Sequence, residues 1–269
     1  MAYNFIPQVI INIEDEIYSN EVYDIDFRIL RDLNSYNSGA RININNLSNA
    51  TKTKLLSKDI LNISILAGYK TSDVGLIFRG FIRQAKKNNT LGVELYCDEG
   101  AGQLVQDVIE KNYAPGTSLK EIVKNVIEIS NFKFNSIECD DYIFERGYNV
   151  KGNIFDILDD LSNVVQARFY IKMGILYFVK KDFSDNEIEI SASTGLMSIK
   201  EVDDGYLSSY KVEMQLNNLI REGDTLIVKN SDGETFKKIV ETVSHTYRKN
   251  KFTTIVECGD YKEQGEENG

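Results

Sequence analysis

The spacing of apolar residues changes twice along this chain, and these changes limit the folds that it can adopt. Up to about residue 100, apolar residues alternate with polar ones, as at Tyr23, Ile25, Phe27 and Ile29. From about 101 to 183 they recur at helical spacing, and beyond residue 190 they alternate again. Alternation is the period of a strand with one buried face, and a spacing of three or four is that of an amphipathic helix. We therefore expect a mainly β chain with a helical insert.

Short strands fill the first third. Besides the run at Tyr23–Ile29, strands are predicted at Arg41–Asn45, Ile60–Leu66, Gly75–Arg83 and Leu91–Cys97. A short helix is predicted at Asn49–Leu56 and a turn at Ala67–Tyr69. Many short strands separated by turns are typical of a barrel or a sandwich.

Two helices and a hairpin are predicted in the middle third. Ser118 followed by Glu121 is a capping-box pattern, so a helix is expected to begin at Leu119. A second helix begins near Asn153. The apolar faces of the two helices are Ile122, Val123, Val126, Ile127 and Ile129, and Ile154, Ile157, Leu158, Leu161, Val164 and Val165. A hairpin turning at Lys172–Gly174 completes a small α/β domain.

The last third returns to strands and repeats part of the first. Asp59–Cys97 contains a strand, a Ser-Asp turn, Phe78, a strand, a polar turn and a strand that ends in cysteine. Asp224–Cys258 contains the same features in the same order, with Phe236 in the place of Phe78. The expected fold class is therefore α+β, mainly β. It has two tube-like β-barrels, at 1–100 and 191–269, and an α/β domain inserted at 101–190. The polar, acidic run at 260–269 is predicted to be a disordered tail.

No group of residues in the sequence has the spacing of a catalytic site. Gly100 and Gly102 form a G-x-G pattern, but Val105 stands where a dinucleotide fingerprint needs a small residue. His245 is the single histidine and lacks partners for a triad or a zinc site. We therefore predict no catalytic, cofactor-binding or metal-ligating residues, and no enzyme.

The three cysteines are far apart in sequence and contain no C-x-x-C pair. Cys97 and Cys258 fall on the inward faces of predicted strands, and Cys139 lies between the two predicted helices. Buried, reduced cysteines without metal or disulfide are expected, as in a reducing cytoplasm.

The chain is acidic, with 31 basic against 41 acidic residues and a net charge of −10. Such a surface repels phosphate backbones, so no sequence-specific nucleic-acid binding is expected. It is compatible with a channel wall past which DNA slides. The sequence has no apolar run of about 18 residues and no basic leader, so neither membrane insertion nor a signal peptide is expected.

Three segments resemble baseplate hub proteins of contractile phage tails, including the Mu-like type, and of phage-tail-like bacteriocins. They are ISILAGYKTSDVGLIFRGFI at Ile63–Ile82, STGLM at Ser193–Met197 and QLNNLIREGDTLIV at Gln215–Val228. The order of parts, with a β region, an α/β insert and a second β region, agrees over nearly the whole chain. Residues expected on barrel or ring strands are Leu66, Gly68, Tyr69, Phe78, Gly80, Phe81, Gly223, Asp224, Ile227 and Phe236.

The resemblance implies a homotrimer that joins the tail-tube ring to the spike protein and contacts other baseplate proteins. It implies no cofactor and no catalytic residue. Assembly is expected in the bacterial cytoplasm, and the finished protein is expected in a phage tail or tailocin particle, a contractile injection system. The alternatives are a tail-associated cell-wall hydrolase and a tail-assembly adaptor or chaperone.

Overall fold

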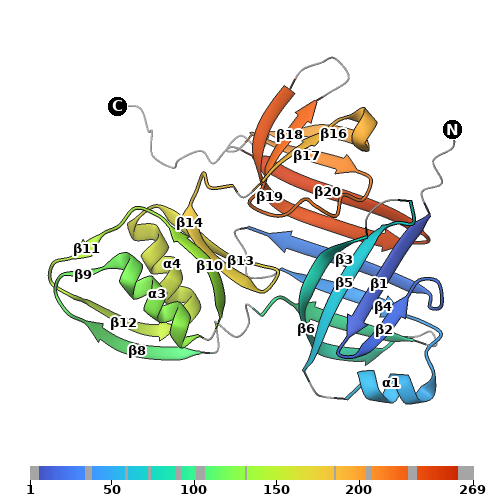
Figure 1. The fold of residues 1–269 in the computed structure, drawn as a ribbon, viewed down its shortest axis with the longest axis horizontal. Helices are drawn as coiled ribbons and strands as arrows, with labels where there is room; N and C mark the ends of the chain where they lie inside the picture. The colour runs from blue at the N-terminus through green and yellow to red at the C-terminus, as the bar shows by residue number, and fades with distance from the viewer. Residues whose placement is uncertain are drawn as a thin grey trace.

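The computed structural model describes residues 6–33, 38–57, 60–71, 74–88, 92–100, 107–130, 132–184, 186–203, 208–229 and 235–259. The chain is mainly β, as expected, with few helices (Figure 1). The acidic tail at 260–269 and the Ser-Asp turns at 72–73 and 231–232 lie outside the described residues. No helix in the described part of the chain is long and apolar enough to span a bilayer.

Among the described residues, thirteen strands from both ends of the chain form one sheet. The first β region contributes β1 (Pro7–Ile13), β2 (Glu16–Ser19), β3 (Ile25–Asp32), β4 (Gly39–Ile44), β5 (Leu61–Tyr69), β6 (Gly75–Lys87) and β7 (Val93–Asp98), with α1 (Asn49–Leu55) after β4. The second contributes β15 (Glu187–Ile190), β16 (Leu196–Asp203), β17 (Ser208–Met214), β18 (Thr225–Lys229), β19 (Thr235–Arg248) and β20 (Lys251–Gly259), with a 3-10 turn at Ala192–Thr194.

The long strand β19 joins the two β regions. Its residues Thr235–Ile239 pair with β18, and its residues Thr242–Tyr247 pair with β3. Among the described strands, the order of paired strands runs from β16 at one end to β2 at the other, and these two end strands do not pair with each other. The described strands therefore do not form a closed barrel. Since β19 pairs with strands of both β regions, the sheet is not divided at the predicted domain boundaries. The boundaries at residues 100 and 190 therefore stay a prediction.

The insert lies beside the two β regions (Figure 1). It consists of β8 (Val108–Tyr113), β9 (Thr117–Ser118), α3 (Leu119–Ile129), β10 (Lys133–Glu138), β11 (Ile143–Phe144), β12 (Tyr148–Asn153), α4 (Ile154–Val164), β13 (Ala167–Lys172) and β14 (Ile175–Lys180). Strands β10, β14 and β13 form one sheet, and β8–β12 and β9–β11 form two short ladders.

Both predicted helix starts are confirmed by their caps. The Ser118 Oγ accepts a hydrogen bond of 3.2 Å from the N–H of Glu121, and the Asn153 Oδ1 accepts one of 2.8 Å from the N–H of Asp156. The predicted apolar faces are buried apart from their C-terminal ends. Ile129 is 41% exposed and Val164 is 43% exposed. Each is the last residue of its helix, where the apolar stripe no longer faces the sheet.

Of the four apolar clusters in the described residues, three correspond to the two β regions and the insert. The first core is not made by the first β region alone, because Tyr247 of β19 and Phe252 of β20 pack into it. Their rings lie 5.8 and 6.4 Å from the ring of Phe27. All three cysteines are buried, and none of them is in a disulfide. Aromatic side chains thus pack the two β regions against each other.

The predicted repeat is confirmed in strand order. In the first β region the order across the sheet is β3-β4-β7-β6-β5, and in the second it is β16-β17-β20-β19-β18. Each region therefore contains a unit of five consecutive strands connected in the same way. We call these β3–β7 and β16–β20 the two repeat units.

The registers of the two repeat units also agree. Phe78 lies opposite Ile65, and Phe236 lies opposite Val228. Cys97 faces Ile82 and Cys258 faces Val240, and in both ladders the register shifts directly after that pair. A shared bulge at the same place is a strong sign of a common backbone plan, because a bulge reorients both strands.

One prediction of local structure is wrong. The expected turn at Ala67–Tyr69 is the end of β5, which continues to Tyr69. Ala67 pairs with Val9 on one side and with Gly75 on the other. Ladders on both sides satisfy the backbone there, which outweighs the turn preference of Gly68.

Candidate functional site

The insert and both β regions meet at a buried arginine. Strand β3 points Ile25, Phe27 and Ile29 inward, and Arg31 takes the next inward position with no solvent exposure. The sequence predictions missed this residue, although a charged side chain at an inward position of an alternating strand is a signal that could have found it. A buried guanidinium needs partners for its five N–H groups.

Arg31 has partners in all three parts of the molecule, although its Nη1 donates no hydrogen bond among the described residues. Its Nε donates to the Glu99 Oε1 over 3.0 Å, and its Nη2 donates to the carbonyl of Ile77 over 2.5 Å. Nη2 also lies 2.9 Å from the Sδ of Met173 in the insert. Its Nη1 lies 3.8 Å from the Oε2 of Glu222 in the second β region. One side chain therefore ties the three parts together.

A second buried ion pair lies close by in the same loop of the second β region. The Lys172 Nζ of the insert donates to the Asp224 Oδ1 over 3.0 Å, and the Asp224 Oδ2 accepts from the N–H of Arg221 over 2.8 Å. The Arg221 guanidinium donates to the carbonyl of Leu76 in β6. We call Arg31, Glu99, Lys172, Arg221, Glu222 and Asp224 the junction.

Burial shifts the pKa values in the junction. It raises the pKa of Glu99 to about 7, against the opposing effect of Arg31 and together with repulsion from Glu222. It also raises the pKa of Glu222 and of Asp224. Desolvation lowers the pKa of Arg221 to about 10. The junction thus holds three basic and three acidic side chains, and burial disfavours the charged form of each of the three carboxyl groups.

His245 lies buried beside the junction. Burial, followed by the charges of Arg31 and Arg221, lowers the pKa of His245 well below its usual value. Its Nδ1 lies 2.9 Å from the Oγ1 of Thr254. No group of three or more His, Cys, Asp or Glu residues in the described part of the chain could hold a metal ion. The ion pairs and hydrogen bonds of the junction are suited to holding the insert and the two β regions together.

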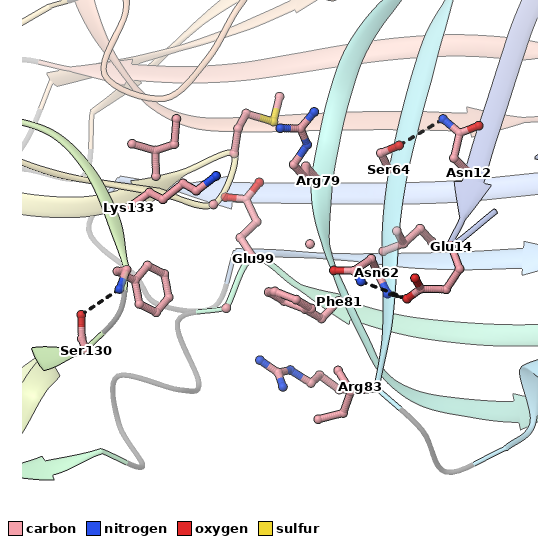
Figure 2. Close-up of a pocket in the computed structure, with 18 residues that line it drawn as sticks. Asn12, Glu14, Asn62, Ser64, Arg79, Phe81, Arg83, Glu99, Ser130 and Lys133 are labelled. Carbon is pink, nitrogen blue, oxygen red and sulfur yellow. Dashed lines mark hydrogen bonds between the residues drawn. The ribbon is translucent and has the colours of Figure 1, made fainter. Parts of the chain in front are cut away.

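An open groove of about 750 Å³ begins at Glu99 and separates the first β region from the insert (Figure 2). Its floor is the outer face of β1, β5 and β6, and its opposite wall comes from the insert. The lining residues are Asn12, Glu14, Ile60, Asn62, Ile63, Ser64, Arg79, Gly80, Phe81, Arg83, Glu99, Gly100, Ser130, Phe132, Lys133, Met173, Gly174 and Ile175.

The residues predicted for ring strands do not converge on one site. Gly80 and Phe81 line the groove, and Gly223 and Asp224 belong to the junction loop. Phe78 is buried in the first core, and Tyr69 packs edge-on against Phe252. The others lie in strands: Leu66 and Gly68 on β5, Ile227 on β18 and Phe236 on β19. Their role in a ring stays a prediction.

Gly223 shows why the junction loop needs a glycine. Its φ is +82°, and an added Cβ would lie 2.9 Å from the hydroxyl of Tyr170 in the insert. Glycine adopts this backbone conformation without strain, and it leaves room for the tyrosine. The loop can therefore approach the insert closely enough for Asp224 to reach Lys172.

Solved structures that this chain resembles include tail proteins and a component of a secretion system. A tail protein from Neisseria meningitidis matches with a TM-score of 0.69 and 9% identity, over 95% of this chain and 97% of that one. The 43 kDa tail protein of prophage MuSo2 from Shewanella oneidensis matches with a TM-score of 0.64 and 8% identity, over 93% and 96%. A component of the type VI secretion system of E. coli, described as structurally similar to T4 tail proteins gp27 and gp5, matches at 0.59 with 12% identity, over 94% and 77%.

The sequence matches no protein-family model and no curated protein. The likeness thus lies in the arrangement of strands and helices along nearly the full chain, where identity is no more than 12%. At this identity the likeness concerns the fold alone, and the chain shares the fold of these phage tail proteins.

Proposed function

We propose that this chain is a structural hub protein of a contractile phage tail or of a tailocin, and not an enzyme. In this role it is a homotrimer that joins the six-fold ring of the tail tube to the three-fold spike. It also contacts other baseplate proteins. It is assembled in the bacterial cytoplasm and carried in the finished particle. The fold shared with tail proteins supports the general role, and the repeat units support the specific one.

The matching register of the two repeat units is the observation that carries this proposal. A tube of six subunits and a spike of three can be joined if each of three chains offers two similar surfaces. The pairs Ile65–Phe78 and Val228–Phe236 recur at equal places in the two units. Three copies then present six near-equivalent units, each completing a tube-like barrel wall in the ring.

The free edges of the sheet also suit a ring. Among the described strands, β2 and β16 are the two ends of the pairing path, and each pairs on one side. An edge strand with unpaired backbone groups attracts another strand. In a closed ring, contacts between neighbouring copies cover such edges.

The mass of the purified protein in solution tests the proposal. We expect a species of three times the chain mass of 30.6 kDa by analytical ultracentrifugation. The same protein is expected in purified tail particles on mass spectrometry. A stable monomer that is absent from particles would identify an assembly adaptor instead, and release of sugars or peptides from cell walls would identify a hydrolase.

A further inference from the structure

The contact between the two repeat units within one chain shows how units of neighbouring copies can join. In this contact, β19 of the second unit pairs with β3, the first strand of the first unit. Since β20 runs along the other side of β19, the strands β18 and β3 pair with β19 on the same side, one after the other. The far end of β19, at Thr242–Tyr247, is thus the part that receives a strand of the other unit.

The equivalent strands at the opposite ends of the two units have open edges. Strand β6 takes the place of β19, and its ladder with β5 ends at Ile82. The residues Gln84–Lys87 continue along β7, but on the side of β5 they pair with no strand of the described structure. Strand β16 takes the place of β3, and among the described strands it pairs with β17 alone. Open edges of this kind attract another strand.

One chain cannot join these two edges to each other. Strands β6 and β16 are separated by six described strands in the order of pairing, and they lie in different β regions (Figure 1). A second copy of the chain can supply the missing partner of each edge, because every copy carries both.

We propose that β6 of one copy pairs with β16 of the next copy, in the same antiparallel manner as β19 pairs with β3 within a chain. This inference rests on the proposed trimer and names the surfaces that join its subunits. Copies linked in this way are related head to tail, and three of them close a ring. Contacts within a chain and contacts between chains then alternate around the ring and share one plan.

The shared bulge determines the register of the ladder between copies. Ile82 of β6 and Val240 of β19 stand at equal places, directly before this bulge. Lys87 follows the first of them by five positions, and His245 follows the second by five. Lys87 therefore takes the place of His245, which lies opposite Ile29.

The residue of β16 that takes the place of Ile29 follows from the same pairing. Ile29 is connected to Cys97 through two successive cross-strand pairs, over β4 and β7. Glu201 is connected to Cys258 in the same way, over β17 and β20. Because the two cysteines stand at equal places, Glu201 takes the place of Ile29. The ladder therefore brings Lys87 of one copy directly opposite Glu201 of the next.

The side chains at the two edges are complementary in this register. Lys87 and Glu201 are exposed and have opposite charges, and opposite charges that face each other across a ladder are stabilising. A slip by one position would bring Lys87 opposite Lys200, a like charge. Val202, which is 45% exposed, comes to lie opposite Lys86, whose methylene stem can cover it.

A pair of cysteines in the full chain tests the register. Directly opposite residues of an antiparallel ladder have Cα atoms about 4.5 to 5.5 Å apart, which is within the range of a disulfide. We expect the variant with both Lys87→Cys and Glu201→Cys to give a covalent species of three times the chain mass of 30.6 kDa on a non-reducing gel after oxidation. The three native cysteines are buried, so they are expected to add little background.

A pair shifted by one position is the matched control. Lys87→Cys combined with Lys200→Cys puts the two thiols on opposite faces of the ladder, so much less of the covalent species is expected. Analytical ultracentrifugation of both variants under reducing conditions gives their solution mass. A trimer that cross-links no better with the first pair than with the second would overturn the ladder and leave the proposed trimer standing. A monomer would contradict the trimer and the ladder together.

Charge reversal tests the contact between Lys87 and Glu201. Lys87→Glu is expected to raise the concentration at which the trimer dissociates by about threefold to tenfold, because it places like charges opposite each other. Adding Glu201→Lys to the same chain is expected to restore the original value. Lys124→Glu, at an exposed position of α3, makes the same change of charge away from the ladder and is expected to have little effect. Equal weakening by Lys124→Glu, or no recovery in the double variant, would contradict the pairing.

Discussion

At the scale of single residues, the junction depends most on Arg31, because its guanidinium contacts all three parts of the molecule. We expect Arg31→Met to lower the free energy of unfolding by about 3 to 5 kcal/mol, since it leaves the buried Glu99 without the guanidinium with which it is paired. Urea unfolding measures this change. Arg28→Met, on the exposed face of the same strand, is expected to have little effect. If Arg28→Met were equally harmful, the junction would not be the cause.

The pH dependence of stability follows from the raised pKa of Glu99. In the folded state the pKa of Glu99 is about 7, above the ordinary value of 4.5, so the folded state binds this proton more tightly than the unfolded state. The stabilising contribution is complete below the unfolded pKa and is lost as the pH rises through 7. Unfolding midpoints are therefore expected to fall between pH 5 and pH 8.

Glu99→Gln provides the control for this pH dependence. The variant removes the titrating group and keeps an oxygen that can accept from Arg31, so the fall between pH 5 and pH 8 is expected to become shallower. It should not vanish, because burial also raises the pKa of Glu222 and Asp224. An unchanged slope in Glu99→Gln would contradict the assignment.

At the scale of elements, the close approach of β6 to the end of β7 depends on Gly80. A Cβ at this position would lie 2.0 Å from the carbonyl oxygen of Asp98, and a backbone atom cannot rotate away. We expect Gly80→Ala to destabilise the protein by about 1 to 3 kcal/mol, measured by urea unfolding. Gly75→Ala on the same strand is the comparison. Its Cβ meets the side chain of Asn218, which can move, so a smaller loss is expected.

Local patterns predicted the elements well where neighbours in sequence decide the structure. The cap at Ser118 and the one at Asn153 involve residues three positions away, so their signals are readable in the sequence. The turn predicted at Ala67–Tyr69 was wrong because pairing with β1, far away in sequence, decides the conformation there. The repeat was readable because both copies keep the same landmarks, Phe78 and Phe236.

The junction and the groove could not be predicted from local patterns. Arg31 and Glu99 are 68 positions apart, and Arg31 meets Met173 and Glu222 only when the insert and the second β region pack against the first. The sequence shows that Arg31 lies on an inward face, but not which carboxylates meet it. The groove likewise arises between parts: Arg79 and Lys133 belong to separate sheets.

At the scale of the whole molecule, the two repeat units predict where each part of the chain lies in a particle. If three copies build the ring, the units β3–β7 and β16–β20 of one chain are related by a rotation of about 60° about the ring axis, because six near-equivalent units share a full turn. The insert, built on its own core, is then expected at the outer rim, where other baseplate proteins are within reach. A reconstruction of the particle by electron microscopy measures both. Six copies of the chain, repeat units at unequal radii, or an insert that lines the central channel would each contradict this arrangement.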